Sequence, residues 1–289
     1  MSNLYIYYLT DKCNFRCTYC YEEQGKTRKN TRVTRENIIH FIDKTVEESK
    51  DQEQLLYVLF GGEPFLEFDH MKFFTEYATK RRQEVCGNSN VRFTTFTNGA
   101  FFWKDENFLK FLHLDAVKSR NFTVLVSYDG IGNYKRLDVH GKDTTDRTLK
   151  VMKKFGELCK RGFVDFCISY TVCKDNFNKL YQDLDNILSS FTVNKIMLQF
   201  NTDELAKEFN ITVQNRDGGD IKKSVEKFVF DHNRDIPKLY NKYHIPICEY
   251  ACSECKRCVN PHSEYVYGYK EDVRSLDAKE SHNKSQILI

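Results

Sequence analysis

Residues 4–20 of the 289-residue chain read LYIYYLTDKCNFRCTYC, a short run of apolar and aromatic residues followed closely by three cysteines. The run at 4–9 is typical of a buried β-strand, because aromatic and β-branched side chains pack well on a pleated sheet. Cys13, Cys17 and Cys20 then fall on the loop after that strand. We therefore expect the first strand of the fold to deliver a cysteine loop.

Five further strand-like runs follow at residues 55–60, 91–96, 122–127, 164–172 and 195–200. Segments with helical spacing lie between them, so the order strand then helix repeats about six times. Such alternation predicts an α/β protein with parallel strands and right-handed crossovers, either a doubly wound sheet or an open barrel. Both architectures bind ligands at the carboxyl ends of the strands.

Composition narrows the class of protein. A hydrophobic content of 40 % is ordinary for a globular chain, and the formal charge of +3 gives no strong electrostatic reason to expect nucleic-acid binding. No apolar run approaches the roughly 20 residues that span a bilayer, and the N-terminus lacks the pattern of a signal peptide. We expect a cytoplasmic protein without a membrane partner, in which eleven cysteines indicate metal or redox chemistry.

The first cysteine group has C-x3-C-x2-C spacing. Three thiolates can hold three irons of a cubane cluster and leave the fourth iron open to a ligand, whereas a structural zinc site needs four closed ligands. A zinc site completed by a distant residue is the alternative.

Glycine-rich and polar motifs follow three later strands. Gly61-Gly62-Glu63-Pro64 follows the second strand, Thr97-Asn98-Gly99 the third, and the fourth ends in Ser127-Tyr-Asp129-Gly130. A glycine turn permits close backbone approach, and a carboxylate beside it suits an ammonium group. Each motif alone also fits an ordinary turn or helix start.

Together these motifs resemble the radical S-adenosylmethionine (SAM) superfamily, and within it the SPASM/twitch branch of anaerobic sulfatase-maturating enzymes and peptide maturases. The family signature is CxxxCxφC with an aromatic φ, here Tyr19. The resemblance implies a partial (β/α)6 barrel over residues 1–205. It also implies a [4Fe–4S] cluster on Cys13, Cys17 and Cys20, whose fourth iron binds SAM and whose electron cleaves it to a 5′-deoxyadenosyl radical.

The resemblance further implies roles for the strand-end residues. Gly61, Gly62, Glu63 and Pro64 would meet the amino group of SAM, and Thr97 and Asn98 would shape the floor of the site. Ser127 and Asp129 would bind the ribose or the carboxylate of SAM, and Arg136 would pair with that carboxylate. Family members usually carry His-Asp before this arginine, where Tyr134-Lys135 stands here, and an exposed helix-capping arginine is the alternative.

Gln199 lies near the end of the sixth strand. If side chains alternate between the two faces of that strand, Gln199 points toward the barrel mouth and contacts the substrate. A hydrogen-bonded core glutamine is the alternative.

A second cysteine group, Cys248, Cys252, Cys255 and Cys258, places four thiols within eleven residues. Thiols this close imply a metal, either a second [4Fe–4S] cluster or a structural zinc ion. The position resembles a SPASM or twitch extension, which we assign to residues 206–289. The cysteines are too few for two auxiliary clusters.

The leading functional hypothesis is hydrogen abstraction from a peptide or protein side chain, with flavodoxin or ferredoxin as the reducing partner. A second hypothesis is modification of a nucleotide or a nucleic-acid base, which basic runs such as Lys80-Arg81-Arg82 allow. A third is a non-catalytic iron–sulfur or zinc protein used for binding or sensing.

Overall fold

Six parallel strands form the body of the sheet, and they match the six runs that the sequence predicts. The structure, a computed structural model, describes residues 2–20, 33–130, 135–212, 220–249 and 287–288. The strands are β1 (Ser2–Thr10), β2 (Gln54–Gly61), β3 (Val91–Thr97), β4 (Phe122–Tyr128), β5 (Asp165–Val172) and β6 (Lys195–Phe200). The predicted α/β class is therefore confirmed.

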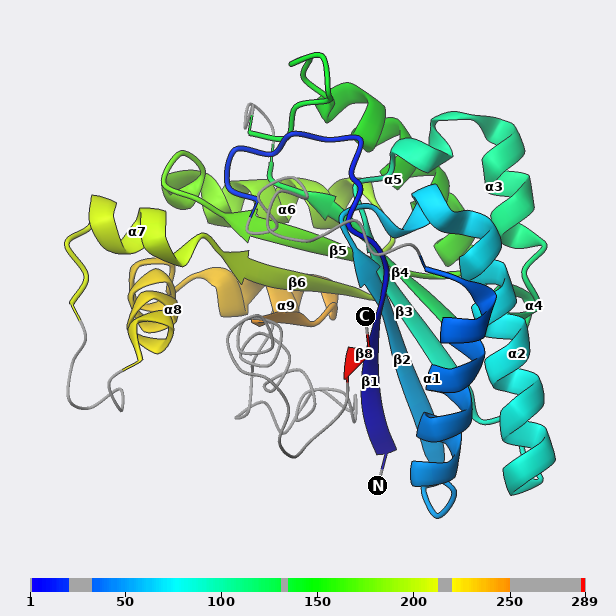
Figure 1. The fold of residues 1–289 in the computed structure, drawn as a ribbon. Helices are drawn as coiled ribbons and strands as arrows, with labels where there is room; N and C mark the ends of the chain where they lie inside the picture. The colour runs from blue at the N-terminus through cyan, green and yellow to red at the C-terminus, as the bar shows by residue number, and fades with distance from the viewer. Residues whose placement is uncertain (1, 21–32, 131–134, 213–219, 250–286, 289) are drawn as a thin grey trace.

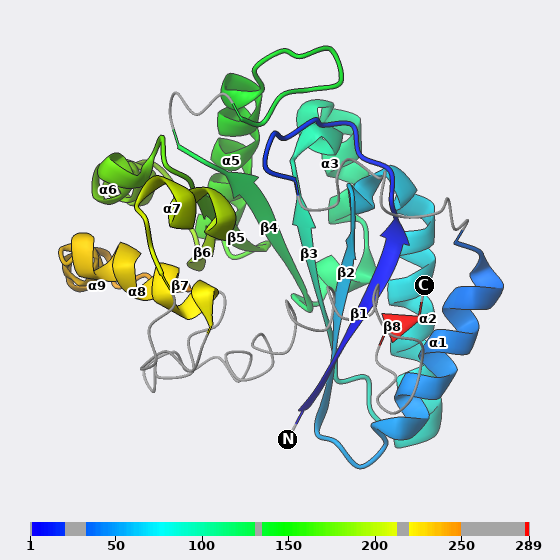
Figure 2. The same cartoon turned by 60° about the vertical axis from the view of Figure 1, so that its left-hand side comes forward.

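Two short strands extend the sheet at its edges. Strand β7 (Ile247–Glu249) pairs in parallel with β6, and β8 (Ile287–Leu288) pairs in parallel with β1, which gives the order β7-β6-β5-β4-β3-β2-β1-β8. The strands fan out from β1 to β6, so the sheet curves into an open barrel (Figures 1 and 2). This is the partial barrel that the sequence predicts.

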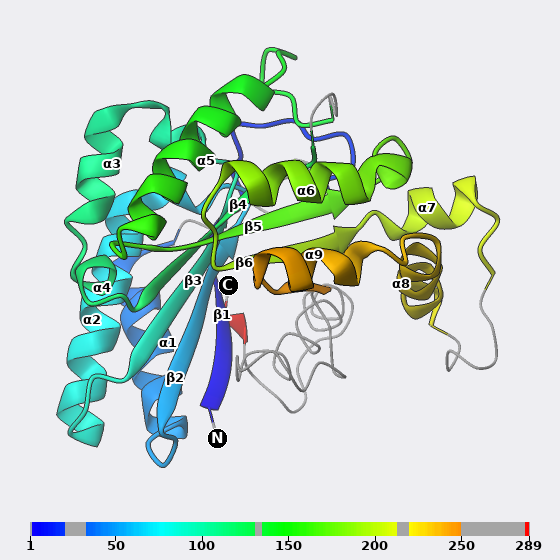
Figure 3. The ribbon, with the colours of Figure 1, turned by 180° about the vertical axis from the view of Figure 1, so that it is seen from behind.

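Helices follow most of the strands and cover the convex face of the sheet. Seen from behind, α5, α6 and α9 lie over the strands (Figure 3). The helices are α1 (Arg35–Glu48), α2 (Phe68–Cys86), α3 (Asp105–Leu112), α4 (Asp115–Lys118), α5 (Thr145–Lys160), α6 (Leu180–Ser190), α7 (Thr202–Glu208), α8 (Ile221–His232) and α9 (Ile236–Tyr243), with short 3₁₀ turns η2 (Pro64–Glu67), η3 (Ala100–Trp103) and η4 (Phe177–Lys179). Among the helices that the structure describes, none has both the length and the hydrophobicity of a bilayer-spanning segment.

Side chains alternate between the two faces of the sheet along each strand and so form two separate apolar layers. On β1, the buried Tyr7 ring packs toward the helices, with its centroid 4.8 Å from Phe41 and 5.1 Å from Phe74. Ile6 and Tyr8 point to the opposite, concave face and join a smaller buried cluster there. Large aromatic side chains supply much of the buried area on the helical side. The concave layer forms the bottom of the barrel below the strand ends.

The proposed boundary at residue 205 stays a prediction, although β7 and β8 show that later residues also pair with this sheet. Of the second cysteine group, Cys248 belongs to β7. Cys252, Cys255 and Cys258 lie outside the described residues.

Candidate functional site

A cavity of about 790 Å³ opens at the carboxyl ends of the strands, where the sequence motifs come together. Such a volume is in the range of small-molecule sites. Most of the predicted site residues line it, namely Cys13, Cys17, Tyr19, Cys20, Gly61, Gly62, Thr97, Asn98, Ser127, Arg136 and Gln199. Glu63, Pro64 and Asp129 are buried beside this cavity rather than on its wall.

The cysteine loop is held by backbone hydrogen bonds to the segment that follows β4. The Arg16 amide donates to the Leu137 carbonyl at 2.7 Å, and the Thr18 amide donates to the Lys135 carbonyl at 3.0 Å. Phe15 forms an isolated antiparallel bridge with Asp138. The loop is therefore fixed against chain that lies more than 100 residues away in sequence.

The three thiols of the loop are free and half-buried. Burial raises the pKa of the Cys13 thiol to about 12 and also raises the pKa of Cys17, where the charge of Arg136 acts in the opposite direction. Both thiols thus stay protonated at neutral pH until a cation displaces the proton. The Phe15 amide donates to Cys13 Sγ at 3.4 Å, a bond of the kind that tunes iron–sulfur clusters.

Three thiols on one wall of the cavity are a donor set that could hold an iron–sulfur cluster. Within the described residues, no three His, Cys, Asp or Glu side chains converge as ligands of one ion would. A cubane cluster instead takes each thiolate on a different iron, so its ligands stand apart around one wall of a cavity. Cys13, Cys17 and Cys20 all line the wall described above, where each could bind a different iron.

Gly61 and Gly62 allow the end of β2 to touch the start of the cysteine loop. The Gly62 amide donates to the Thr10 carbonyl at 2.9 Å. Gly61 has a φ of +138°, and a Cβ there would lie 2.1 Å from the Thr10 carbonyl oxygen. A Cβ on Gly62 would lie 2.5 Å from the Lys12 carbonyl oxygen. Only glycine fits at these positions without moving the loop.

Glu63 joins the turn after β2 to the turn after β3. Its buried carboxylate accepts hydrogen bonds from the Asn98 amide at 2.7 Å, the Thr97 hydroxyl at 2.9 Å and the Phe65 amide at 3.2 Å. Burial raises the pKa of Glu63 to about 7, and these three donors act in the opposite direction. Its predicted contact with the amino group of SAM stays a prediction. Pro64 occupies the first turn of η2, where its missing N–H costs nothing.

Asn98 connects the third motif to the cysteine loop. Its Nδ2 donates to Asn14 Oδ1 at 2.7 Å and lies 3.7 Å from Cys13 Sγ, while its Oδ1 accepts from the Ala100 amide at 2.9 Å. Gly99 follows with a φ of +83°. The Asn-Gly pair is thus a turn in which the Asn98 side chain supports the cysteine loop.

Tyr19, Arg136 and the buried Asp129 form a hydrogen-bonded group on the other side of the cysteine loop. The Tyr19 hydroxyl donates to the Asp129 carboxylate, and Arg136 Nη1 donates to that hydroxyl at 2.7 Å and lies 3.8 Å from Asp129 Oδ1. Burial raises the pKa of Asp129, and the Arg136 charge opposes this shift. The charge of each member of the ion pair is stabilised by the other.

The guanidinium of Arg136 retains one unused donor. Its side chain is 15 % exposed, and its buried Nε has no hydrogen-bond partner within the described part of the chain. Arg136 is therefore not an exposed cap but part of the cavity wall. A planar guanidinium with a free N–H is suited to bind a carboxylate.

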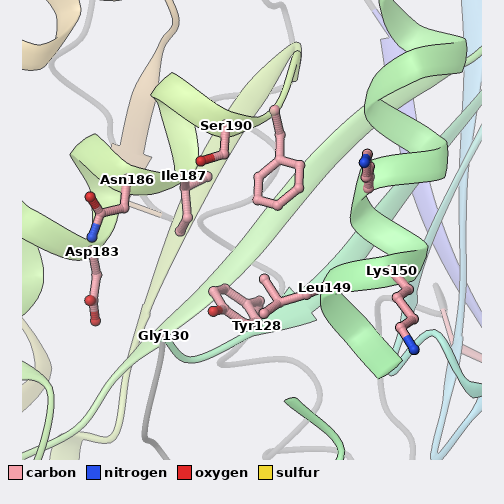
Figure 4. A pocket seen from close by; sticks show the side chains of 10 residues that line it. Tyr128, Gly130, Leu149, Lys150, Asp183, Asn186, Ile187 and Ser190 are labelled. Carbon is pink, nitrogen blue, oxygen red and sulfur yellow. The ribbon is translucent and has the colours of Figure 1, made fainter. Parts of the chain in front are cut away.

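The last residues of β4 point alternately to opposite sides of the sheet. Ser127 lines the cavity, whereas Tyr128 lines a separate hollow of about 360 Å³ between α5 and α6, where Leu149 and Ile187 also lie (Figure 4). Gly130 closes this end, because a Cβ there would lie 2.2 Å from Asp183 Oδ2. The S-x-D-G motif thus positions Ser127 and Asp129 on the side of the site and leaves Tyr128 behind it.

Several cavity residues were not among the predicted site residues. Ser169 and Thr171 on β5 line the cavity, and Thr171 lies beside Gln199 of β6 in the sheet register. The alternation that indicates Gln199 also applies to residues 164–172 and would have found both. Glu204, which forms an ion pair with Lys135, has no comparable local signal because its position depends on contacts across the barrel mouth.

Comparisons with known proteins show the family to which the chain belongs. The sequence profile of the Radical SAM superfamily matches residues 7–184. The radical SAM cyclopropyl synthase TigE of Paramaledivibacter caminithermalis is 23 % identical over 218 residues, which cover 70 % of this chain and 42 % of that protein. A cysteine-type anaerobic sulfatase-maturating enzyme of Clostridium perfringens is 27 % identical over 179 residues, which cover 59 % of this chain and 45 % of the enzyme.

A solved structure described as native anSMEcpe with bound AdoMet and Kp18Cys peptide shares the fold, with a TM-score of 0.61 and 22 % identity over 86 % of this chain and 64 % of that one. The chain spans less than half the length of the two curated relatives named above.

Proposed function

Because the chain belongs to the radical SAM superfamily, we propose that it is an oxidoreductase-type enzyme that abstracts hydrogen from a side chain of a peptide or protein. The family implies a [4Fe–4S] cluster and SAM, which together supply reductive cleavage of SAM to methionine and a 5′-deoxyadenosyl radical. The observation that carries the proposal is one cavity lined by three free thiols and by an arginine with an unused donor.

The residues of the cavity divide into two sets. Cys13, Cys17 and Cys20 would hold the cluster, and the guanidinium of Arg136 would bind the carboxylate of SAM. Asp129 would keep Arg136 oriented through the ion pair and through Tyr19. Gly61 and Asn98 fix the loop itself and so hold the thiols in place.

The remaining wall would accept the substrate. Ser127, Ser169, Thr171 and Gln199 present hydroxyl and amide groups, while Phe60 and Phe96 line the apolar part of the cavity. Apolar walls keep water away from a reactive intermediate, and a few polar groups fix its orientation. A sulfatase-maturating relative supports a protein substrate, and a relative named radical SAM cyclopropyl synthase supports radical SAM chemistry.

Anaerobic reconstitution with iron and sulfide tests the proposal. We expect the reconstituted protein to convert SAM to 5′-deoxyadenosine when dithionite is added, and a peptide substrate to increase that yield. A protein that carries a full cluster and forms no 5′-deoxyadenosine would overturn the enzymatic assignment.

Replacement of Arg136 by methionine should weaken SAM binding by about tenfold or more, because a charged hydrogen bond to the carboxylate is lost. Equilibrium dialysis of SAM against the reconstituted protein measures the effect. Arg161→Met, at an exposed arginine after α5, is the matched control and should bind like wild type. Unchanged affinity in the Arg136 variant would remove this residue from the SAM site.

The second cysteine group would bind an auxiliary cluster through Cys248, Cys252, Cys255 and Cys258, with zinc as the alternative metal. We expect Cys255→Ala to retain SAM cleavage, to lose product formation, and to lose about four irons per chain on metal analysis. Loss of one zinc with unchanged iron would identify a zinc site instead. A cytoplasmic location and a flavodoxin or ferredoxin as reductant complete the proposal.

A further inference from the structure

The outer face of α5 carries basic side chains that the proposed chemistry does not use. Arg147, Lys150 and Lys153 are exposed and follow one another at intervals of three residues, so they project from the same side of the helix. None of them has an ion-pair partner in the described part of the chain, whereas Lys154 pairs with Asp105. Because the formal charge of the whole chain is only +3, this positive charge is a local feature.

These side chains surround a groove of about 490 Å³ with an apolar floor. The floor includes Phe102, Trp103 and Val151. Among the described residues that line the groove, Glu157 alone is acidic. The Arg147 guanidinium lies over the Trp103 ring, 4.6 Å from its centroid. Trp103 Nε1 is buried and has no partner in the part of the chain that the structure describes. The groove thus combines an apolar floor, an Arg147–Trp103 stack and a cationic rim.

Two aromatic rings connect this groove to the cysteine loop. Trp103 packs on Phe15 with ring centroids 6.0 Å apart, and Phe15 is 2 % exposed. Phe15 lies between Cys13 and Cys17 in sequence, and its amide donates to Cys13 Sγ. Electron tunnelling is faster through packed atoms than across a gap. The contact therefore forms a short, continuous path from the outer surface to a cluster ligand.

We propose that this basic groove is the docking site of a small acidic flavoprotein that reduces the cluster. The inference rests on the proposed function. One electron leaves the reduced flavin and enters the cluster. The flavin is oxidised by one electron, the cluster is reduced by one electron, and no atom passes between the proteins. An exposed flavin edge is flat and apolar, so carboxylates around it would face Lys150 and Lys153 while the edge meets the Arg147–Trp103 pair. A partner bound to α5 lies outside the barrel and leaves the cavity open to the substrate.

Binding of flavodoxin to the reconstituted protein, measured at several salt concentrations, tests the docking site. We expect Lys150→Glu with Lys153→Glu to raise the Kd about tenfold or more at low salt and to reduce its salt dependence. Lys110→Glu with Lys160→Glu makes the same charge change at exposed positions outside the groove and should leave the Kd at the wild-type value. Equal Kd values for the two double variants would overturn the proposal, and tighter binding of ferredoxin than of flavodoxin would overturn the assigned partner.

The choice of reductant separates this proposal from the proposed function. The Lys150/Lys153 variant should cleave SAM at the wild-type rate with dithionite, which needs no docking, and more slowly with reduced flavodoxin. If the wild type does not cleave SAM with dithionite, the proposed function is wrong. The docking site is still tested in that case, because the flavodoxin Kd is measured independently of SAM cleavage. Trp103→Leu should slow cluster reduction at saturating flavodoxin, and an unchanged rate would remove Trp103 from the path.

Discussion

Replacement of Cys17 by alanine should abolish formation of 5′-deoxyadenosine and remove the visible absorbance of the cluster. The variant leaves two of the three thiols that line the cavity, and a cubane with two protein ligands has two open irons instead of one. It also removes a thiol whose pKa is raised by burial, lowered by the Arg136 charge and raised by the Asp129 charge. The expected fall in the rate of SAM cleavage is at least about a thousandfold, to the background of the assay.

The control for this experiment is Cys86→Ala, at a half-buried free thiol at the end of α2. That variant should bind iron and cleave SAM like wild type, since Cys86 does not line the cavity. SAM cleavage by the Cys17 variant at the wild-type rate would show that the first cysteine group does not hold the cluster.

Replacement of Gly61 by alanine should have the next largest effect. The new Cβ would overlap the Thr10 carbonyl oxygen at 2.1 Å, so either β1 or the turn must move, and Cys13 lies three residues further on. Overpacking against backbone that cannot yield costs about 3 kcal/mol or more. We expect a lower free energy of unfolding of the apoprotein, measured in urea, and a loss of iron after reconstitution.

Gly87→Ala is the control that distinguishes steric overlap of the new Cβ from the strain of a positive φ. Gly87 also has a positive φ, +69°, but a Cβ there would meet nothing within 4 Å. Its substitution should cost only about 1 kcal/mol and leave iron binding unchanged. Similar iron loss in both variants would show that glycine at position 61 is not needed for close approach to the cysteine loop.

The sequence predicts the sheet well because several strands, β2 and β5 among them, are buried on both faces. Strands of this kind appear as continuous apolar runs, and residues 55–60 are a clear example. The motif residues are predicted to lie together because the carboxyl ends of parallel strands meet at one edge of the sheet. The alternation argument also places Gln199 on the cavity wall.

Contacts between distant segments could not be predicted in the same way. Glu63 has the sequence context of a residue that faces a ligand, but its carboxylate is bonded to Thr97 and Asn98 of another strand end. The orientation of Arg136 depends on the pairing of its neighbours with Arg16 and Thr18 in the cysteine loop. Such features depend on tertiary packing, which local sequence patterns do not encode.

The alternation at the end of β4 also has a consequence for the directed evolution of this chain. Val124, Val126 and Tyr128 belong to the helix-facing core, while Leu125 lies in the concave layer and Ser127 reaches the cavity. Libraries that vary the helix-facing core positions would sample thermostability. Libraries that vary Ser127, Ser169 and Gln199 would sample the range of substrates. A selection for new substrates can therefore diversify one side of the sheet while the other side preserves the scaffold.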